Sequence, residues 1–191
     1  MIYQKTTDMV QIKKCTFEHM TKSYPCKEKS VLDGCMIMRQ SIKPEDVQSP
    51  FQVEAYALLF CISGEVNIIS DLRSYTVTPG TLFVYLPNNI IKIDCKKESI
   101  ISGVILAPDY LRKNFLQWNK ISPLFIQTAN NPVITIPTNR KDELIRMLDN
   151  IQERIKTATC SEWNRKAYHA ALKTFLYDII SLVNNPEFLK I

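Results

Sequence analysis

Residues 55–106 constrain the fold more than any other stretch, because short apolar runs alternate there with turn signals. The turn signals are Ser63-Gly64, Ser70-Asp71, Pro79-Gly80, Pro87-Asn88-Asn89 and Lys96-Lys97-Glu98. Each run spans four to seven residues and is rich in Val, Ile, Phe, Tyr and Leu, which is typical of strands rather than helices. A meander of about five or six antiparallel strands with an apolar face must curl or form two layers to bury that face. The sequence therefore predicts a small β-barrel or roll.

The composition is that of an ordinary globular chain of one domain with an appendage. Its 191 residues are 46% hydrophobic and 23% charged, and the net charge of +5 is spread along the chain. The six cysteines form no CxxC pair and show no metal-ligand spacing, so we expect reduced thiols and a cytoplasmic protein. No run approaches the roughly 18 apolar residues that span a bilayer, so we expect no membrane association.

The elements outside this meander are predicted from local signals. Residues 1–14 are expected to form an arm, and residues 15–20 and 31–40 two weaker strands. A short helix is predicted from Pro108 to about Trp118, because proline is favoured at the first helical position, and a last short strand at residues 133–136.

From Thr138 the apolar period changes to that of helices, and two long helices are predicted. Asn139 and Asp142 resemble a capping pair for the first, and Ser161 is expected to cap the second, which ends near Pro186.

The second long helix carries an apolar arc that is wider than one packing partner requires. Five of its apolar residues follow one another at intervals of four, three, four and three positions, as in the seam of a coiled coil. Leu176, Ile180 and Val183 widen the arc to roughly half of the helix circumference. Either the whole arc is buried within one chain, or the seam binds a second subunit. We predict a homodimer through the seam residues Tyr168, Leu172, Phe175, Ile179 and Leu182.

No catalytic constellation is visible in the sequence. His19 and His169, the only histidines, lie on different predicted elements, and four glycines leave no phosphate-binding loop. We therefore predict no enzyme, no metal and no cofactor. A barrel without reactive groups can still enclose a small molecule. The polar and aromatic strand residues are Arg39, Tyr56, Phe60, Arg73, Tyr75, Tyr85 and Lys92, of which five are predicted to bind a ligand: Arg39, Tyr56, Phe60, Tyr85 and Lys92.

The segments LLFCISGEV and TVTPGTLFVYLPNNII, followed by a proline-opened helix and two further helices, resemble the N-terminal regulatory domain of AraC-type transcription regulators. The resemblance covers nearly the whole chain. It implies a mainly β fold with C-terminal α structure. A cupin-like antiparallel β-barrel (a double-stranded β-helix or jelly roll) would occupy residues 1–137, and an antiparallel two-helix dimerisation hairpin residues 138–191.

The same resemblance implies a function and partners. A small effector, a sugar or another metabolite, would bind in the barrel, with residues 1–14 folding over it and Lys92 at the mouth. DNA would be bound only through a C-terminal helix-turn-helix domain that residues 1–191 do not supply. The chain is then either a truncated form of a longer regulator, which we favour, or a stand-alone sensor.

Catalytic cupins offer a contrasting function. Counting from Gly64 and Gly80, their metal-ligand positions fall near Phe51, Val53 and Lys92 and at Ala57, none of which suits a metal. The predicted function is thus the ligand-sensing and dimerisation domain of a bacterial regulator with a metal-free barrel. Two alternatives stay open: a cupin enzyme with an atypical site, and a dimerisation module with a filled barrel and no ligand. A cyclic-nucleotide roll is disfavoured, since no arginine-bearing phosphate cassette is present.

Overall fold

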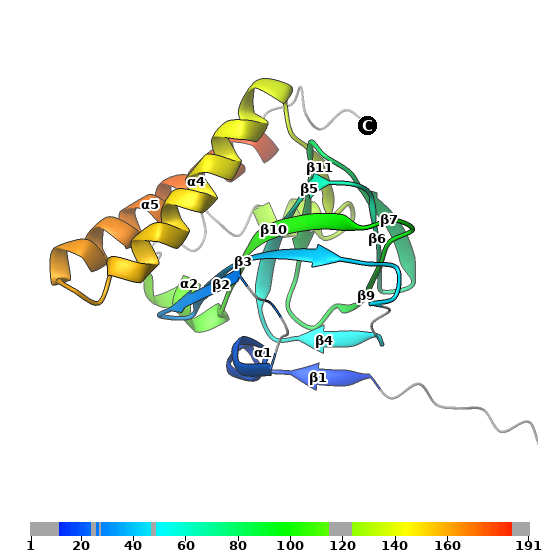
Figure 1. Ribbon diagram of the computed structural model, residues 1–191, viewed down its shortest axis with the longest axis horizontal. Coiled ribbons are helices and arrows are strands. Elements are labelled where there is room, and N and C mark those ends of the chain that lie inside the picture. The colour runs from blue at the N-terminus through cyan, green and yellow to red at the C-terminus, as the bar shows by residue number, and fades with distance from the viewer. Residues whose placement is uncertain (1–11, 24–25, 27, 47–48, 115–123, 185–191) are drawn as a thin grey trace, which may run out of the picture.

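The computed structural model describes residues 12–23, 26, 28–46, 49–114 and 124–184 (Figure 1). Residues 124–128 are helical. The other helices and strands are, in chain order, β1 (Lys13–Cys15), α1 (Phe17–Ser23), β2 (Glu28–Leu32), β3 (Cys35–Ile42), β4 (Phe51–Val53), β5 (Tyr56–Ser63), β6 (Val66–Ser70), β7 (Arg73–Val77), β8 (Thr81–Tyr85), β9 (Ile90–Asp94), β10 (Ser99–Leu106), α2 (Pro108–Asn114), β11 (Val133–Thr135), α4 (Thr138–Thr157) and α5 (Glu162–Val183).

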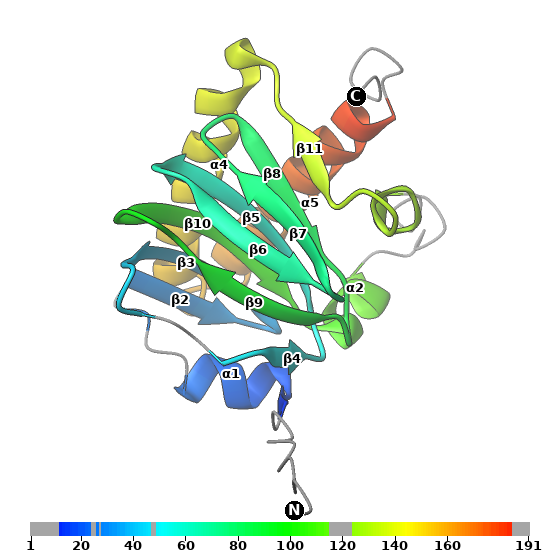
Figure 2. The ribbon, with the colours of Figure 1, turned by 90° about the vertical axis from the view of Figure 1, so that its right-hand side faces the viewer.

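The strands form two sheets that face each other. One has the order β1-β4-β9-β6-β7 and the other the order β11-β8-β5-β10-β3-β2. Within them β4-β9-β6-β7 lies opposite β8-β5-β10-β3, the arrangement of an eight-stranded jelly roll (Figure 2). Only the short pair β1–β4 is parallel among the described strand pairs. The predicted fold class is therefore confirmed: a mainly β, cupin-like roll followed by C-terminal helices.

The six-stranded sheet has an apolar core on each of its two faces. Along β5, Ala57, Leu59 and Cys61 point into the roll, whereas Leu58 and Phe60 point to the helices. Helices α4 and α5 lie against this outer face as an antiparallel hairpin (Figures 1 and 2). Burial on both faces explains why the strand reads as a continuous apolar run instead of an alternating one.

The apolar arc of α5 is buried within one chain. Four of its seam residues are 0% exposed and the fifth is 8% exposed, and all belong to the core between the helices and the six-stranded sheet. The predicted dimer seam is thereby corrected, because these side chains fill a core and form no surface. The residues concerned are Tyr168, Leu172, Phe175, Ile179 and Leu182.

The long helices begin where the sequence predicts, but only one has the expected cap. The hydroxyl of Ser161 accepts a hydrogen bond from the Asn164 amide at 3.1 Å, which confirms it as the cap of α5. The predicted Asn139–Asp142 cap is wrong, since α4 follows Pro137 directly and no side chain caps it. Helix α2 begins at Pro108 as predicted, and its predicted end at Trp118 lies outside the described residues.

The N-terminal region differs most from the prediction. Part of the strand predicted at residues 15–20 is helix α1, because the hydroxyl of Thr16 accepts a hydrogen bond from the His19 amide at 3.2 Å and caps a helical turn. The strand predicted at residues 31–40 is instead the hairpin β2–β3. Its turn is Asp33-Gly34, with φ angles of 52° and 85°. Most of the predicted arm at residues 1–14 lies outside the described residues.

Candidate functional site

The interior of the roll is apolar and almost filled. Its cavity has a volume of about 40 Å³, far below the roughly 300 Å³ at the lower end of small-molecule sites. The lining includes Met20, Met38, Leu59, Tyr85, Ile91 and Ile101.

The hydroxyl of Tyr85 is the polar side-chain group of this lining, and the protein backbone already engages it. It accepts a hydrogen bond from the Val53 amide at 2.8 Å, and the carbonyl oxygens of Val53 and Asn89 lie 2.9 and 2.8 Å away as acceptors. Burial raises the pKa of Tyr85 to about 12, so the hydroxyl stays neutral. The interior therefore suits a small apolar group and not a sugar.

Helix α1 covers one end of the roll beside β1 and β4 (Figure 1). Its Phe17 and Met20 are 6% and 7% exposed and belong to the core inside the roll, and Met20 also lines the cavity. Any larger molecule could enter the interior from this end only if α1 moved.

Of the five predicted ligand-binding residues, Tyr85 alone lies in the core inside the roll. Arg39 reaches away from it to α4, where its Nη2 lies 2.8 Å from Oδ1 of Asp149. Lys92 alternates along β9 with the inward-pointing Ile91 and Ile93, so it lies on the outer face of the five-stranded sheet.

The two remaining predicted residues pack under the helices. The ring of Tyr56 lies 4.3 Å from that of Phe125, and the ring of Phe60 lies 6.1 Å from that of Phe175 on α5. The prediction that Arg39, Tyr56, Phe60 and Lys92 line the roll is thus corrected. The physical reason is strand alternation, which turns these four side chains away from the interior.

The described residues offer no group of three His, Cys, Asp or Glu side chains close enough to hold a metal ion. Val53 and Ala57, two of the positions compared with catalytic cupins, contribute only apolar surface to the cavity. Among the described helices, none is both long and apolar enough to cross a membrane.

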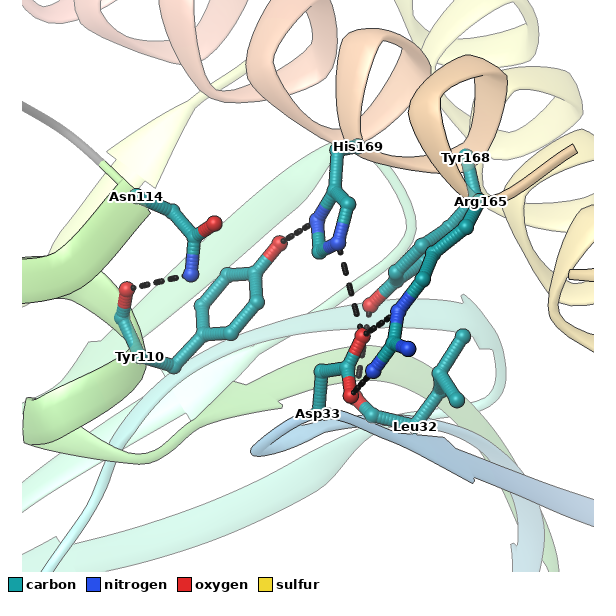
Figure 3. Close-up of polar contacts among 7 residues, drawn as sticks. All are labelled: Leu32, Asp33, Tyr110, Asn114, Arg165, Tyr168 and His169. Carbon is teal, nitrogen blue, oxygen red and sulfur yellow. Dashed lines mark hydrogen bonds and ion pairs between the residues drawn. The ribbon is translucent and has the colours of Figure 1, made fainter. Parts of the chain in front are cut away.

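A polar cluster joins the helices to the roll at the β2–β3 turn (Figure 3). The carboxylate of Asp33 accepts hydrogen bonds from Nε and Nη2 of Arg165 on α5, the former at 2.8 Å. His169, one helical turn further along, has its Nε2 3.4 Å from Asp33 and its Nδ1 2.8 Å from the hydroxyl of Tyr110 on α2. Three segments far apart in the sequence are thereby fastened together.

The protonation states of this cluster follow from its surroundings. Hydrogen bonds from Arg165 hold the pKa of Asp33 below its usual value. Burial lowers the pKa of His169, although the Asp33 carboxylate acts in the opposite direction. In the neutral state, Nδ1 of His169 accepts the Tyr110 hydroxyl hydrogen while Nε2–H points to Asp33.

A carboxylate, an imidazole and a hydroxyl in series resemble a catalytic relay, but the geometry here is structural. Tyr110 is 3% exposed, which leaves its hydroxyl little access to a substrate, and burial raises the pKa of that hydroxyl far above the usual value, so it stays neutral. The cluster positions the helices on the roll. This cluster was not predicted from the sequence, although the Asp33-Gly34 pair and the four-residue spacing of Arg165 and His169 were visible signals.

No protein-family model matches the sequence, and no curated protein matches it. Partial likenesses to solved structures do occur. A conserved protein of unknown function from Streptococcus pyogenes aligns at 17% identity and a TM-score of 0.39 over 41% of this chain and 68% of that one. The EutQ protein of Clostridium difficile aligns at 17% identity and a TM-score of 0.34, over 39% of this chain and 58% of that one. This chain therefore spans less than two thirds of the EutQ protein. A cupin superfamily protein from Desulfitobacterium hafniense aligns at 18% identity and a TM-score of 0.39, over 41% of this chain and 72% of that one.

Proposed function

We propose that this chain is the sensory and dimerisation domain of a bacterial AraC-type transcription regulator and has no catalytic activity. One observation carries the proposal: the same strands, β3, β5, β8 and β10, line the roll on one face and seat the helical hairpin on the other. A change of packing on the roll side of these strands would therefore alter the packing of α5 on their other side.

The polar cluster would make this coupling specific. Asp33 belongs to the turn between two strands of the roll, and its partners Arg165 and His169 belong to α5. A shift of the β2–β3 turn would change the position of α5 and, in the proposed regulator, that of the DNA-binding domain. A ligand acts in this way only if its affinity differs between the two arrangements.

We place the dimer contact on the outward face of α5 instead of the buried seam. Trp163, Lys166, Ala170 and Ser181 are exposed at helical spacing, and Trp163 is 76% exposed. The small Ala170 near the middle of this face would let two such helices approach closely, with Trp163 as an aromatic anchor.

A reporter assay tests the proposed function. Residues 1–191 would be fused to a monomeric helix-turn-helix domain that represses its operator only as a dimer. We expect repression by the fusion, and its loss in Ala170→Glu, because a charge there opposes close helix packing. The matched control is Thr76→Glu, also exposed but on β7, which should repress normally. Repression that is absent, or equal in all three proteins, would contradict the proposal.

A second function has an observation in its favour. The interior of the roll is almost filled, as expected of a dimerisation module that binds no ligand. In that case the reporter would respond to Ala170→Glu, yet no small molecule would change either its output or the melting temperature of the purified chain.

A further inference from the structure

A polar pocket lies outside the apolar interior, between the β6–β7 turn and residues 128–132. Its volume is about 290 Å³, close to the lower limit of roughly 300 Å³ for small-molecule sites and about sevenfold that of the interior cavity. It is lined by residues that include Asp71, Arg73, Tyr75, Asn89 and Asn130.

Hydrogen bonds hold two turns of the chain together at this pocket. The Asp71 amide donates to the carbonyl oxygen of Ile90 at 3.0 Å, and the Ile90 amide donates to Oδ1 of Asp71 at 2.9 Å. The side-chain amide of Asn89 donates to the other carboxylate oxygen of Asp71. The wall formed by β6, β7 and β9 is therefore preorganised.

Both turns contain non-glycine residues in the left-handed region. Asp71, Leu72 and Asn88 have φ angles of 46°, 71° and 71°. Leu72 is also 98% exposed, so burial of its side chain does not explain the conformation. At Asp71 and Leu72 the two-residue hairpin turn between β6 and β7 requires such angles, so the turn fixes the shape of this edge of the pocket.

Three polar side chains of the pocket have no partner within the described structure. The guanidinium of Arg73, the hydroxyl of Tyr75 and the amide of Asn130 make no hydrogen bond or ion pair with a described residue. A guanidinium presents a planar fork of donors that matches a carboxylate or a phosphate. The hydroxyl and the amide, together with the Asp71 carboxylate, can bond to alcohol groups.

We infer that this pocket binds a sugar-sized, hydroxylated molecule that carries one carboxylate or phosphate. Arg73 binds the anionic group, and Tyr75, Asn130 and Asp71 bind the hydroxyls. The inference deepens the proposed sensory function and rests on it, since it places the effector at the edge of the roll.

Amide resonances of uniformly ¹⁵N-labelled chain, titrated with gluconate, glucose 6-phosphate and neutral glucose, test the pocket. We expect gluconate or glucose 6-phosphate to shift the amides of Asp71, Arg73, Asn89 and Asn130 saturably. Glucose should bind at least tenfold more weakly, because it lacks the anion for Arg73. The tighter of the two anionic probes identifies the ligand as a carboxylate or a phosphate.

Two variants and a matched control sharpen this test. Arg73→Gln should weaken the anionic probes at least tenfold, and so should Asn130→Asp, which adds a like charge. Arg154→Gln makes the same change on α4, away from the pocket, and should leave binding intact. Arg73 and Asn130 are exposed, so neither change should unfold the chain.

The outcomes separate the pocket from the proposed function. Equal binding by wild type and Arg73→Gln, shifts confined to Ile91 and Ile101 in the interior, or no shift with any probe would overturn the pocket. Saturable shifts at the pocket that leave every α5 amide unmoved would support the pocket and count against signalling to the helices. The reporter assay tests dimerisation independently of all three probes.

Discussion

His169 sits between groups that oppose each other in their effect on its charge. Burial, Arg165 and Lys173 disfavour the imidazolium, whereas Asp33 favours it, and the net result is a lowered pKa. Protonation would also make Nδ1 a donor toward Tyr110, whose hydroxyl hydrogen would then need another acceptor. The helix–roll junction is therefore built for the neutral imidazole.

We expect acid to weaken this junction. Because the folded-state pKa of His169 lies below the ordinary value of about 6.5, the unfolded chain takes up the proton first as the pH falls. The stabilisation by neutral His169 is complete above pH 6.5 and is lost on acidification toward the folded-state pKa. Melting temperatures of wild type between pH 8 and pH 5 should fall below pH 6.5, and those of His169→Gln should fall less.

His19→Gln is the matched control for this prediction, because His19 lies on α1 and is exposed. It should follow the wild-type curve. The same pH dependence in wild type and in His169→Gln would show that another group senses the acid. The lowered pKa of Asp33 adds a further loss only below about pH 3.8, outside this window.

Single strand residues also show where sequence reasoning has limits. Phe60 and Tyr85 are both buried aromatics, yet one faces the helices and the other the interior. In β5 both faces are apolar, so alternation cannot tell which face lines the roll. Arg73 and Tyr75 were recognisable as polar and aromatic strand residues, but their pocket depends on residues 128–132, which the sequence does not place beside them.

At the scale of elements, α5 depends on the cap that Ser161 provides just before its first residue. The Ser161 hydroxyl accepts a hydrogen bond from the Asn164 amide, one of the otherwise unpaired donors of a helix start. We expect Ser161→Ala to lower the free energy of unfolding by about 1 kcal/mol, measured by urea denaturation. Ser181→Ala, an exposed change inside the same helix, should have no such cost. Equal losses in both would contradict a capping role.

The buried arc of α5 gives a second prediction. Phe175 is 0% exposed and packs on Phe60, so Phe175→Ala should cost about 3–5 kcal/mol of unfolding free energy. Denaturation combined with sedimentation separates the two possible roles of this residue. A variant of wild-type stability that merely loses dimers would restore the coiled-coil interpretation of the arc.

The elements differ in how readily the sequence predicts them. The start of α4 and the cap of α5 follow from local periodicity and one serine, and the structure confirms both. Helix α1 was not predicted, because seven residues are too few for a clear helical period and its stability comes from packing Phe17 and Met20 on the roll. Hairpin β2–β3 was predicted as one strand although Asp33-Gly34 is a strong hairpin signal.

At the scale of the whole molecule, the interior of the roll should behave as a dry space that α1 completes. Met20→Ala would enlarge the cavity of about 40 Å³ and should cost about 2–5 kcal/mol of unfolding free energy. An enlarged apolar cavity should take up benzene, and saturating benzene should then restore part of the lost melting temperature.

Met147→Ala is the matched control, because Met147 is half-buried on α4 and packs against the other core. It should lose less stability and gain nothing from benzene. A Met20→Ala protein that binds a polar sugar in place of benzene would show that the interior is wetter than its lining indicates.

The shared strands also decide how the chain can be divided. If residues 138–191 were removed, the outer face of β3, β5, β8 and β10 would expose Ile37, Leu58, Phe60 and Val104 to water together. A contiguous apolar surface of that kind promotes aggregation. The roll and the helical hairpin therefore share a core across the boundary after residue 137 and are not independent folding units. We expect them to unfold in a single cooperative transition.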